Sequence, residues 1–223
     1  SPRPPGPQAA PRRLNGYNGS TPAQAPGQND DLVFDPQFVN NQANGPSTVD
    51  AAFGGTVKSV TVLGTYPAGY TITLNKDLTV TTTAEIDGGT VAGAKQLNIG
   101  DFGQPGGPPI QFAATLTWKG GTLGGAGGSI VYVNSLSTAN ISNAGVKTLD
   151  GRYLQNYGTV NWDGAGNILL KDSAQLQDWA TMNANMSAAA TIDGNGEANT
   201  LFIVESAATL NVNPQQGPGA DLT

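Results

Sequence analysis

The chain has 223 residues with no cysteine and no histidine, 31 glycines, and charged side chains at only 12% of positions. Without Cys and His it cannot supply a disulfide scaffold, a thiolate or imidazole metal site, or a catalytic triad that uses either residue. No stretch approaches the roughly 18 consecutive apolar residues of a transmembrane helix. We therefore expect no membrane insertion.

The formal charge is divided unevenly along the chain. Residues 1–29 contain Arg3, Arg12 and Arg13 and no acidic residue, whereas all 16 Asp and Glu follow from residue 30 onward. The long acidic part should repel phosphates, so the sequence predicts no nucleic-acid partner.

The first 29 residues are rich in proline and almost free of apolar side chains, which is typical of an extended, basic segment. Because such a segment cannot fold on its own apolar surface, we expect it to lie against the body or a neighbouring subunit. The transitional segment 30–52 contains "DLVFDPQFV", which predicts a short strand or an apolar plug. The residues assigned to assembly are Arg3, Arg12, Arg13, Leu32, Val33, Phe34, Phe38 and Val39.

From residue 53 to residue 213, short apolar bursts with a period of two alternate with Gly, Asn and Asp, as in a series of short strands. The clearest bursts are 57–63, 70–74, 78–82, 114–118, 129–133, 159–162, 167–170, 201–204 and 209–212. One stretch, 172–190, is long enough for a helix, and we interpret it as strands with an Ala-rich bend. Residues 214–223 are a C-terminal tail.

A Gly-Thr-apolar step recurs at Gly55, Gly89 and Gly121, and as Tyr-Gly-Thr at Gly158. Glycine suits corners where successive turns of chain stack closely, because no Cβ intervenes. Asn residues beside the strands favour stacked amide ladders. The pattern predicts a single-domain parallel β-helix (solenoid) over residues 53–213, with about seven coils of roughly 20–25 residues. A β-sandwich is the alternative, and it would show antiparallel hairpins.

The segments "TLTWKGGTLGGAGGSIVYV" and "KTLDGRYLQNYGTVNWDGAGNILLKDSAQLQDWATM" resemble repeats of large secreted and surface-anchored bacterial proteins. The resemblance covers roughly residues 48–212 and leaves out the N-terminal segment. It implies a right-handed parallel β-helix in an adhesin-like or structural setting. That group has no agreed catalytic set, so the resemblance assigns no site residue.

The acidic residues of the body are mostly single and lie in turns, which disfavours a polysaccharide lyase or hydrolase. Arg152 is the one arginine after the N-terminal segment, and we interpret it as a brace for a corner carboxylate such as Asp150. We expect no enzymatic activity and no cofactor.

Two further motifs have a binding interpretation and a structural one. Asp193, Asn195 and Glu197 alternate like the start of a calcium loop, although an Asx-turn between strands explains them too. Three tryptophans could stack on sugars or pack in the core and corners, namely Trp118, Trp162 and Trp179.

Together these observations predict an extracellular or cell-surface structural subunit that assembles with itself into a filament, sheath or surface layer through its N-terminal extension. The alternative is a carbohydrate-binding or adhesive β-helix region of a longer bacterial surface protein, with a surface polysaccharide as partner. Ser1 at the start leaves open a removed signal peptide or a fragment boundary.

Overall fold

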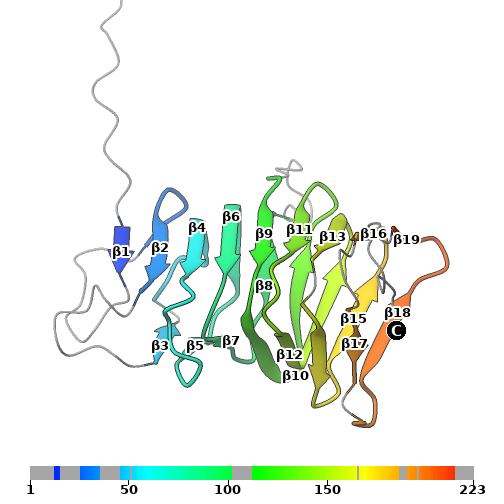
Figure 1. The fold of residues 1–223 in the computed structure, drawn as a ribbon. Helices are drawn as coiled ribbons and strands as arrows, with labels where there is room; N and C mark the ends of the chain where they lie inside the picture. Colours follow the sequence, from blue (N-terminus) through cyan, green and yellow to red (C-terminus); the bar gives the residue numbers. More distant parts are fainter. Residues whose placement is uncertain are drawn as a thin grey trace, which may run out of the picture.

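The computed structural model describes residues 13–15, 26–35, 46–50, 52–101, 112–164, 166–185, 190–194 and 196–213, the first of these ranges by backbone alone. Throughout these ranges the fold is all-β, with 19 strands and no helix. Every paired strand runs parallel to its partner, and Figure 1 shows the strands following one another along a rod from the N-terminal to the C-terminal end. This confirms the predicted solenoid and rules out the sandwich.

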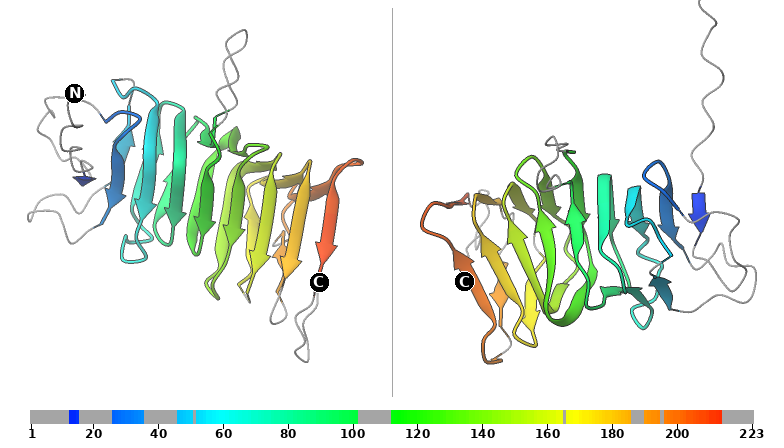
Figure 2. Two further views of the ribbon diagram at one scale, coloured as in Figure 1. Left: turned by 90° about the horizontal axis from the view of Figure 1, so that it is seen from above. Right: turned by 180° about the vertical axis from the view of Figure 1, so that it is seen from behind.

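The strands form three parallel ladders that share a common axis. The first ladder comprises β1 (Arg13–Asn15), β2 (Asp31–Phe34), the second parts of β4 (Thr56–Val62) and β6 (Leu78–Ile86), β9 (Thr115–Trp118), β11 (Thr138–Ile141), β13 (Thr159–Asp163), β16 (Thr181–Asn185) and β19 (Thr209–Val212). Seven coils separate β2 from β19 in this ladder, and Figure 2 shows them from two other sides.

The other two ladders lie on the remaining sides of each coil. The second comprises β3 (Ser47–Val49), β5 (Thr71–Leu74), β7 (Thr90–Ala92), the first parts of β10 (Gly121–Val133) and β12 (Lys147–Asn156), β14 (Ile168–Lys171) and β17 (Ile192–Asp193). The third comprises the first parts of β4 and β6, β8 (Leu97–Ile99), the second parts of β10 and β12, β15 (Gln175–Asp178) and β18 (Leu201–Val204).

Alternate residues of each strand point into the solenoid, and they build one continuous apolar core. In the first ladder, one inward column runs through Val62, Ile86, Trp118, Ile141 and Trp162, all at most 1% exposed. Each coil therefore buries its apolar face against the coil on either side, as expected for a solenoid.

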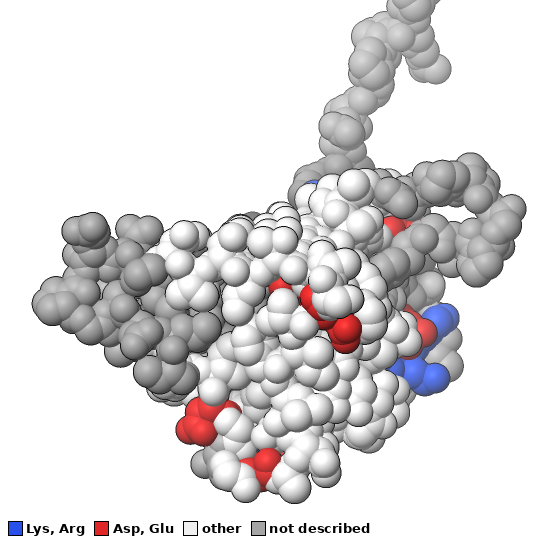
Figure 3. Space-filling model, turned by 90° about the vertical axis from the view of Figure 1, so that its right-hand side faces the viewer, with Lys and Arg blue, Asp and Glu red and all other residues white. Residues whose placement is uncertain are grey.

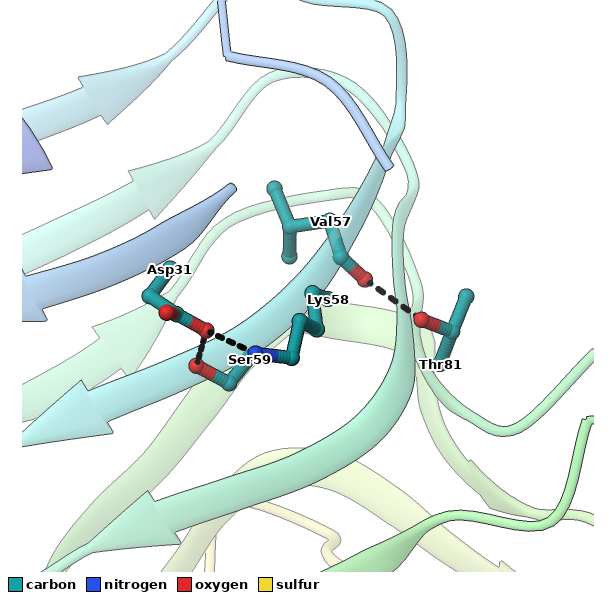
Figure 4. Close-up of polar contacts among 5 residues, drawn as sticks. All are labelled: Asp31, Val57, Lys58, Ser59 and Thr81. Atoms are coloured by element: carbon teal, nitrogen blue, oxygen red, sulfur yellow. Dashed lines mark hydrogen bonds and ion pairs between the residues drawn. The ribbon is translucent and has the colours of Figure 1, made fainter. Parts of the chain in front are cut away.

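The ladders begin earlier than residue 53. β2 pairs with β4, and β3 pairs with β5, so the segment 30–52 contributes strands to the first coil. Polar side chains also join β2 to β4 and β4 to β6 (Figure 4). The Ser59 hydroxyl donates to Asp31 Oδ1 at 2.5 Å, Lys58 Nζ lies 3.7 Å from the same oxygen, and the Thr81 hydroxyl donates to the Val57 carbonyl at 3.2 Å.

The predicted glycine corners are confirmed by the spacing between coils. A Cβ at Gly121 would lie 2.7 Å from the carbonyl oxygens of Gly88 and Gly89 in the coil before it. A Cβ at Gly158 would come closer than 3.0 Å to the carbonyl oxygens of Asn134 and Ser137. Only glycine lets these corners stack at the strand spacing of about 4.8 Å.

Candidate assembly surface at the C-terminal end of the solenoid

An amide ladder follows the outward side of the first ladder. Asn161 Nδ2 donates to Asn140 Oδ1 at 3.0 Å, Asn183 Nδ2 to Asn161 Oδ1 at 3.0 Å, and Asn211 Nδ2 to Asn183 Oδ1 at 2.9 Å. The predicted asparagine ladder therefore exists, and it reaches the last strand. These side chains hold neighbouring coils in register and bring no titratable group to this face.

A second polar column lies inside the solenoid, at the corner between the third and first ladders. Asn156 Nδ2 donates to Asp178 Oδ1 at 2.7 Å and to the Thr181 carbonyl at 2.9 Å. Asp178 is 1% exposed, and its Oδ2 has no hydrogen-bond partner among the described residues. The column continues in β18 with Val204.

Arg152 joins three successive coils instead of bracing Asp150. The side chain is 0% exposed. Its Nη2 donates to the carbonyl oxygens of Gly93 at 3.1 Å and Lys95 at 2.9 Å, and its Nε donates to the Ser129 hydroxyl at 3.2 Å. Burial lowers the pKa of Arg152 to about 10. The predicted brace is therefore corrected: this guanidinium satisfies backbone carbonyls at a corner.

The three tryptophans have different surroundings. Trp118 and Trp162 are 1% and 0% exposed and pack in the core, which removes them from any sugar-stacking surface. Trp179 is 43% exposed and stacks on Tyr157, with ring centroids 5.9 Å apart; Tyr157 stacks in turn on Tyr132 at 6.2 Å. These rings face one another across coils and form a stacked column, in which Trp179 remains partly exposed.

The calcium candidate has little support from the geometry. Asn195 lies outside the described residues, and Glu197 Oε2 accepts a hydrogen bond from the backbone N–H of Asp172. No group of three acidic side chains suitable for a metal ion occurs among the residues that the structure describes.

The pKa of Asp150 is raised, first by burial and then by a side-chain hydrogen bond with Asp172.

The last coil leaves apolar side chains uncovered. Val212 continues the inward column of Val62 and Trp162, yet it is 42% exposed. Val204 continues the inward column of the third ladder and is 39% exposed, and Leu201 beside it is 44% exposed. At Val204 and Val212, β18 and β19 thus expose positions that the earlier coils bury, whereas Leu201 continues the outward column of Tyr153 and Gln175. Figure 3, which faces this end of the rod, shows a mostly uncharged surface with several separate acidic patches.

The residues assigned to assembly at the other end have a different arrangement. Leu32 and Phe34 lie in β2, which confirms the predicted short strand. They are 8% and 7% exposed, so they form the core of the first coil and are not available as a plug. Arg13 lies in β1, whose backbone pairs with β2 of the same chain. Four assigned residues lie outside the described ranges, namely Arg3, Arg12, Phe38 and Val39.

The sequence pattern could not locate the uncovered end, because Val204 and Val212 occupy the same kind of alternating strand as their buried counterparts.

Among the described residues, no helix has the length and hydropathy required to cross a membrane. Comparisons with protein-family models, curated proteins and solved structures found no match to this chain.

Proposed function

We propose that this chain is a non-enzymatic, extracellular structural subunit that assembles with itself into a filament, sheath or surface layer. The observation that carries the proposal is the uncovered last coil, where Val204 and Val212 expose side chains that lie in otherwise buried columns. Open strand edges of this kind are prone to pair with another chain. A contact that uses different surfaces on the two copies does not close, and it generates an open polymer.

The polar interactions of the coils also favour a structural role. The amides of Asn161 and Asn183 are engaged along the rod, and the buried guanidinium of Arg152 is bonded to backbone carbonyls. These groups stabilise the stacking of coils. The extracellular location belongs to the same proposal and rests on the resemblance to secreted β-helix repeats.

The proposal is tested by measuring polymer formation of the full chain with light scattering and negative-stain microscopy. Val212→Glu places a charge on the uncovered end, and because Val212 is already 42% exposed, the coil itself should remain folded. We expect the natural chain to form filaments or sheets and the variant to remain a monomer, because burying an unpaired carboxylate is costly.

A matched control carries the same kind of charge on the side of the rod. Leu136 lies in a corner and is 54% exposed, so Leu136→Glu should assemble like the natural chain. If the natural chain is a monomer at all concentrations, the proposed assembly is wrong. If Val212→Glu assembles as well as Leu136→Glu, the C-terminal end is not the surface used.

A further inference from the structure

The two ends of the chain carry opposite formal charges. Residues 1–29, which include β1, have three arginines and no acid. The last coil, residues 190–213, has Asp193, Glu197 and Glu205 and neither Lys nor Arg. Two C-terminal ends would therefore repel each other, whereas a C-terminal end and an N-terminal extension attract. The occupant that best fits the uncovered coil is the N-terminal end of a second copy.

The register of the first ladder specifies how such a joint would align. β1 is the outermost rung of this ladder at one end, and β19 is the outermost at the other. Every pair between them is parallel and keeps inward residues over inward residues. Continuing that rule from β19 onto a second copy's β1 sets Leu210 against Leu14 and Asn211 against Asn15.

On these grounds we propose that copies stack head to tail, with β19 of one copy adding a parallel rung to β1 of the next, in the register Asn211 to Asn15. This inference rests on the proposed self-assembly and adds its polarity, partner strand and register. Asn15 would then follow Asn211 as the next backbone position of the same column. In this arrangement β1 of the N-terminal extension joins the subunits as a strand.

The absence of cysteine allows a direct test by disulfide cross-linking. Paired Cα atoms of adjacent parallel strands lie about 4.8 Å apart, within the range that a disulfide spans. The double variant Asn15→Cys with Asn211→Cys should therefore give a ladder of linked oligomers on a non-reducing gel. The shifted pair Arg13→Cys with Asn211→Cys places the two Cα atoms roughly 8 Å apart and should cross-link about tenfold less.

Two further variants identify the competing arrangements. Val33→Cys with Asn211→Cys would link only if β19 displaced β1 and paired with β2 directly. Asn211→Cys alone would give a linked dimer if two C-terminal ends met. Either result in preference to the matched pair overturns the inference while leaving self-assembly intact, as does a polymer that no pair cross-links. A chain that forms no polymer overturns both proposals.

Discussion

The two ends of the solenoid differ in how far their inward-facing apolar side chains are exposed. At the N-terminal end, Phe34, Val49 and Val57 are 7%, 7% and 0% exposed. At the C-terminal end, Val204 and Val212 occupy equivalent inward positions and are 39% and 42% exposed. β1 continues the first ladder beyond β2, whereas no strand in the described part of the chain continues it beyond β19.

The difference shows that burial in this fold belongs to the contact between coils and not to the residue itself. In the first ladder, Val62 has a rung on either side and is 0% exposed, whereas Val212 has a described rung on one side only and is 42% exposed. Interior coils should therefore be sensitive to small changes, and the last coil should be tolerant until a second copy covers it.

The largest effect should come from a methyl group placed between two interior corners. Gly158→Ala would direct a Cβ at the carbonyl oxygens of Asn134 and Ser137, which are backbone atoms and cannot rotate away. We expect a loss of about 3 kcal/mol in the free energy of unfolding, measured by urea denaturation.

Gly127→Ala provides the control, since a Cβ there meets no atom within 4 Å. It should change stability by less than about 0.5 kcal/mol. Equal effects of the two substitutions would mean that the corners are not held at the distance that the structure shows.

A Val→Ala substitution at an interior rung and at the last rung compares the two kinds of position directly. Val62 and Val212 lie in one inward column, at 0% and 42% exposure. Val62→Ala should destabilise the fold by about 2 kcal/mol through lost burial and the cavity left behind. Val212→Ala should cost under about 0.5 kcal/mol under conditions where the chain is monomeric. Similar losses at both sites would show that the last coil is covered.

A smaller and opposite effect is expected one rung before the uncovered coil. Asp178 Oδ2 is buried and has no hydrogen-bond partner within the part of the chain that the structure describes, whereas the equivalent Nδ2 of Asn156 donates to the Thr181 carbonyl. Asp178→Asn should therefore stabilise the fold by about 1 kcal/mol. Asp163→Asn is the control, because Asp163 is exposed and its Oδ1 accepts from Asn185. Destabilisation by Asp178→Asn would indicate that Oδ2 has a partner that is not among these residues.

The smallest effect should come from the carboxyl pair at the outer corner of the second ladder. Burial and Asp172 raise the pKa of Asp150 from 3.8, so the folded state holds this proton more tightly than the unfolded state. The stability that this tighter proton binding at Asp150 contributes is present below pH 3.8. It is lost as the pH rises through the folded-state pKa of Asp150.

Asp150→Asn should therefore be more stable than the natural chain at pH 7 by about 0.5 kcal/mol, and the two should converge as the pH falls toward about 4. Thermal unfolding at several pH values measures this. A double variant with Asp172→Asn should add little, because the two carboxyls share one interaction. A constant gap between pH 7 and pH 4 would contradict this explanation.

Much of the fold could be predicted from the sequence because its signals are local. Period-two bursts and Gly-Thr corners predict short strands and close stacking, and the structure confirms both. The start of the ladder could not be predicted, because "DLVF" is a single burst beside prolines. Its membership of the first coil depends on pairing with β4, a contact made 28 residues away at Ser59.

The candidate surface could not be predicted for a related reason. Exposure of Val212 depends on which rung comes last, and no residue type marks that rung. Conversely, the sequence alone suggests a free apolar segment at Leu32 and Phe34, because the coil that covers them is distant in sequence. We expected Arg152 to pair with Asp150, the nearest acid in the chain. Its hydrogen-bond partners are instead the carbonyls of Lys95 and Gly93, 57 and 59 residues away.

The most direct test of the uncovered C-terminal end is hydrogen exchange of residues 201–213, measured at low and at high protein concentration, with residues 159–163 as the interior reference. Assembly through this end should slow exchange of residues 201–213 by about tenfold or more at high concentration and leave the reference unchanged. Val212→Glu should show fast exchange at both concentrations. Exchange in residues 201–213 that is the same at every concentration, in a natural chain that still polymerises, would contradict the assembly surface proposed for this protein.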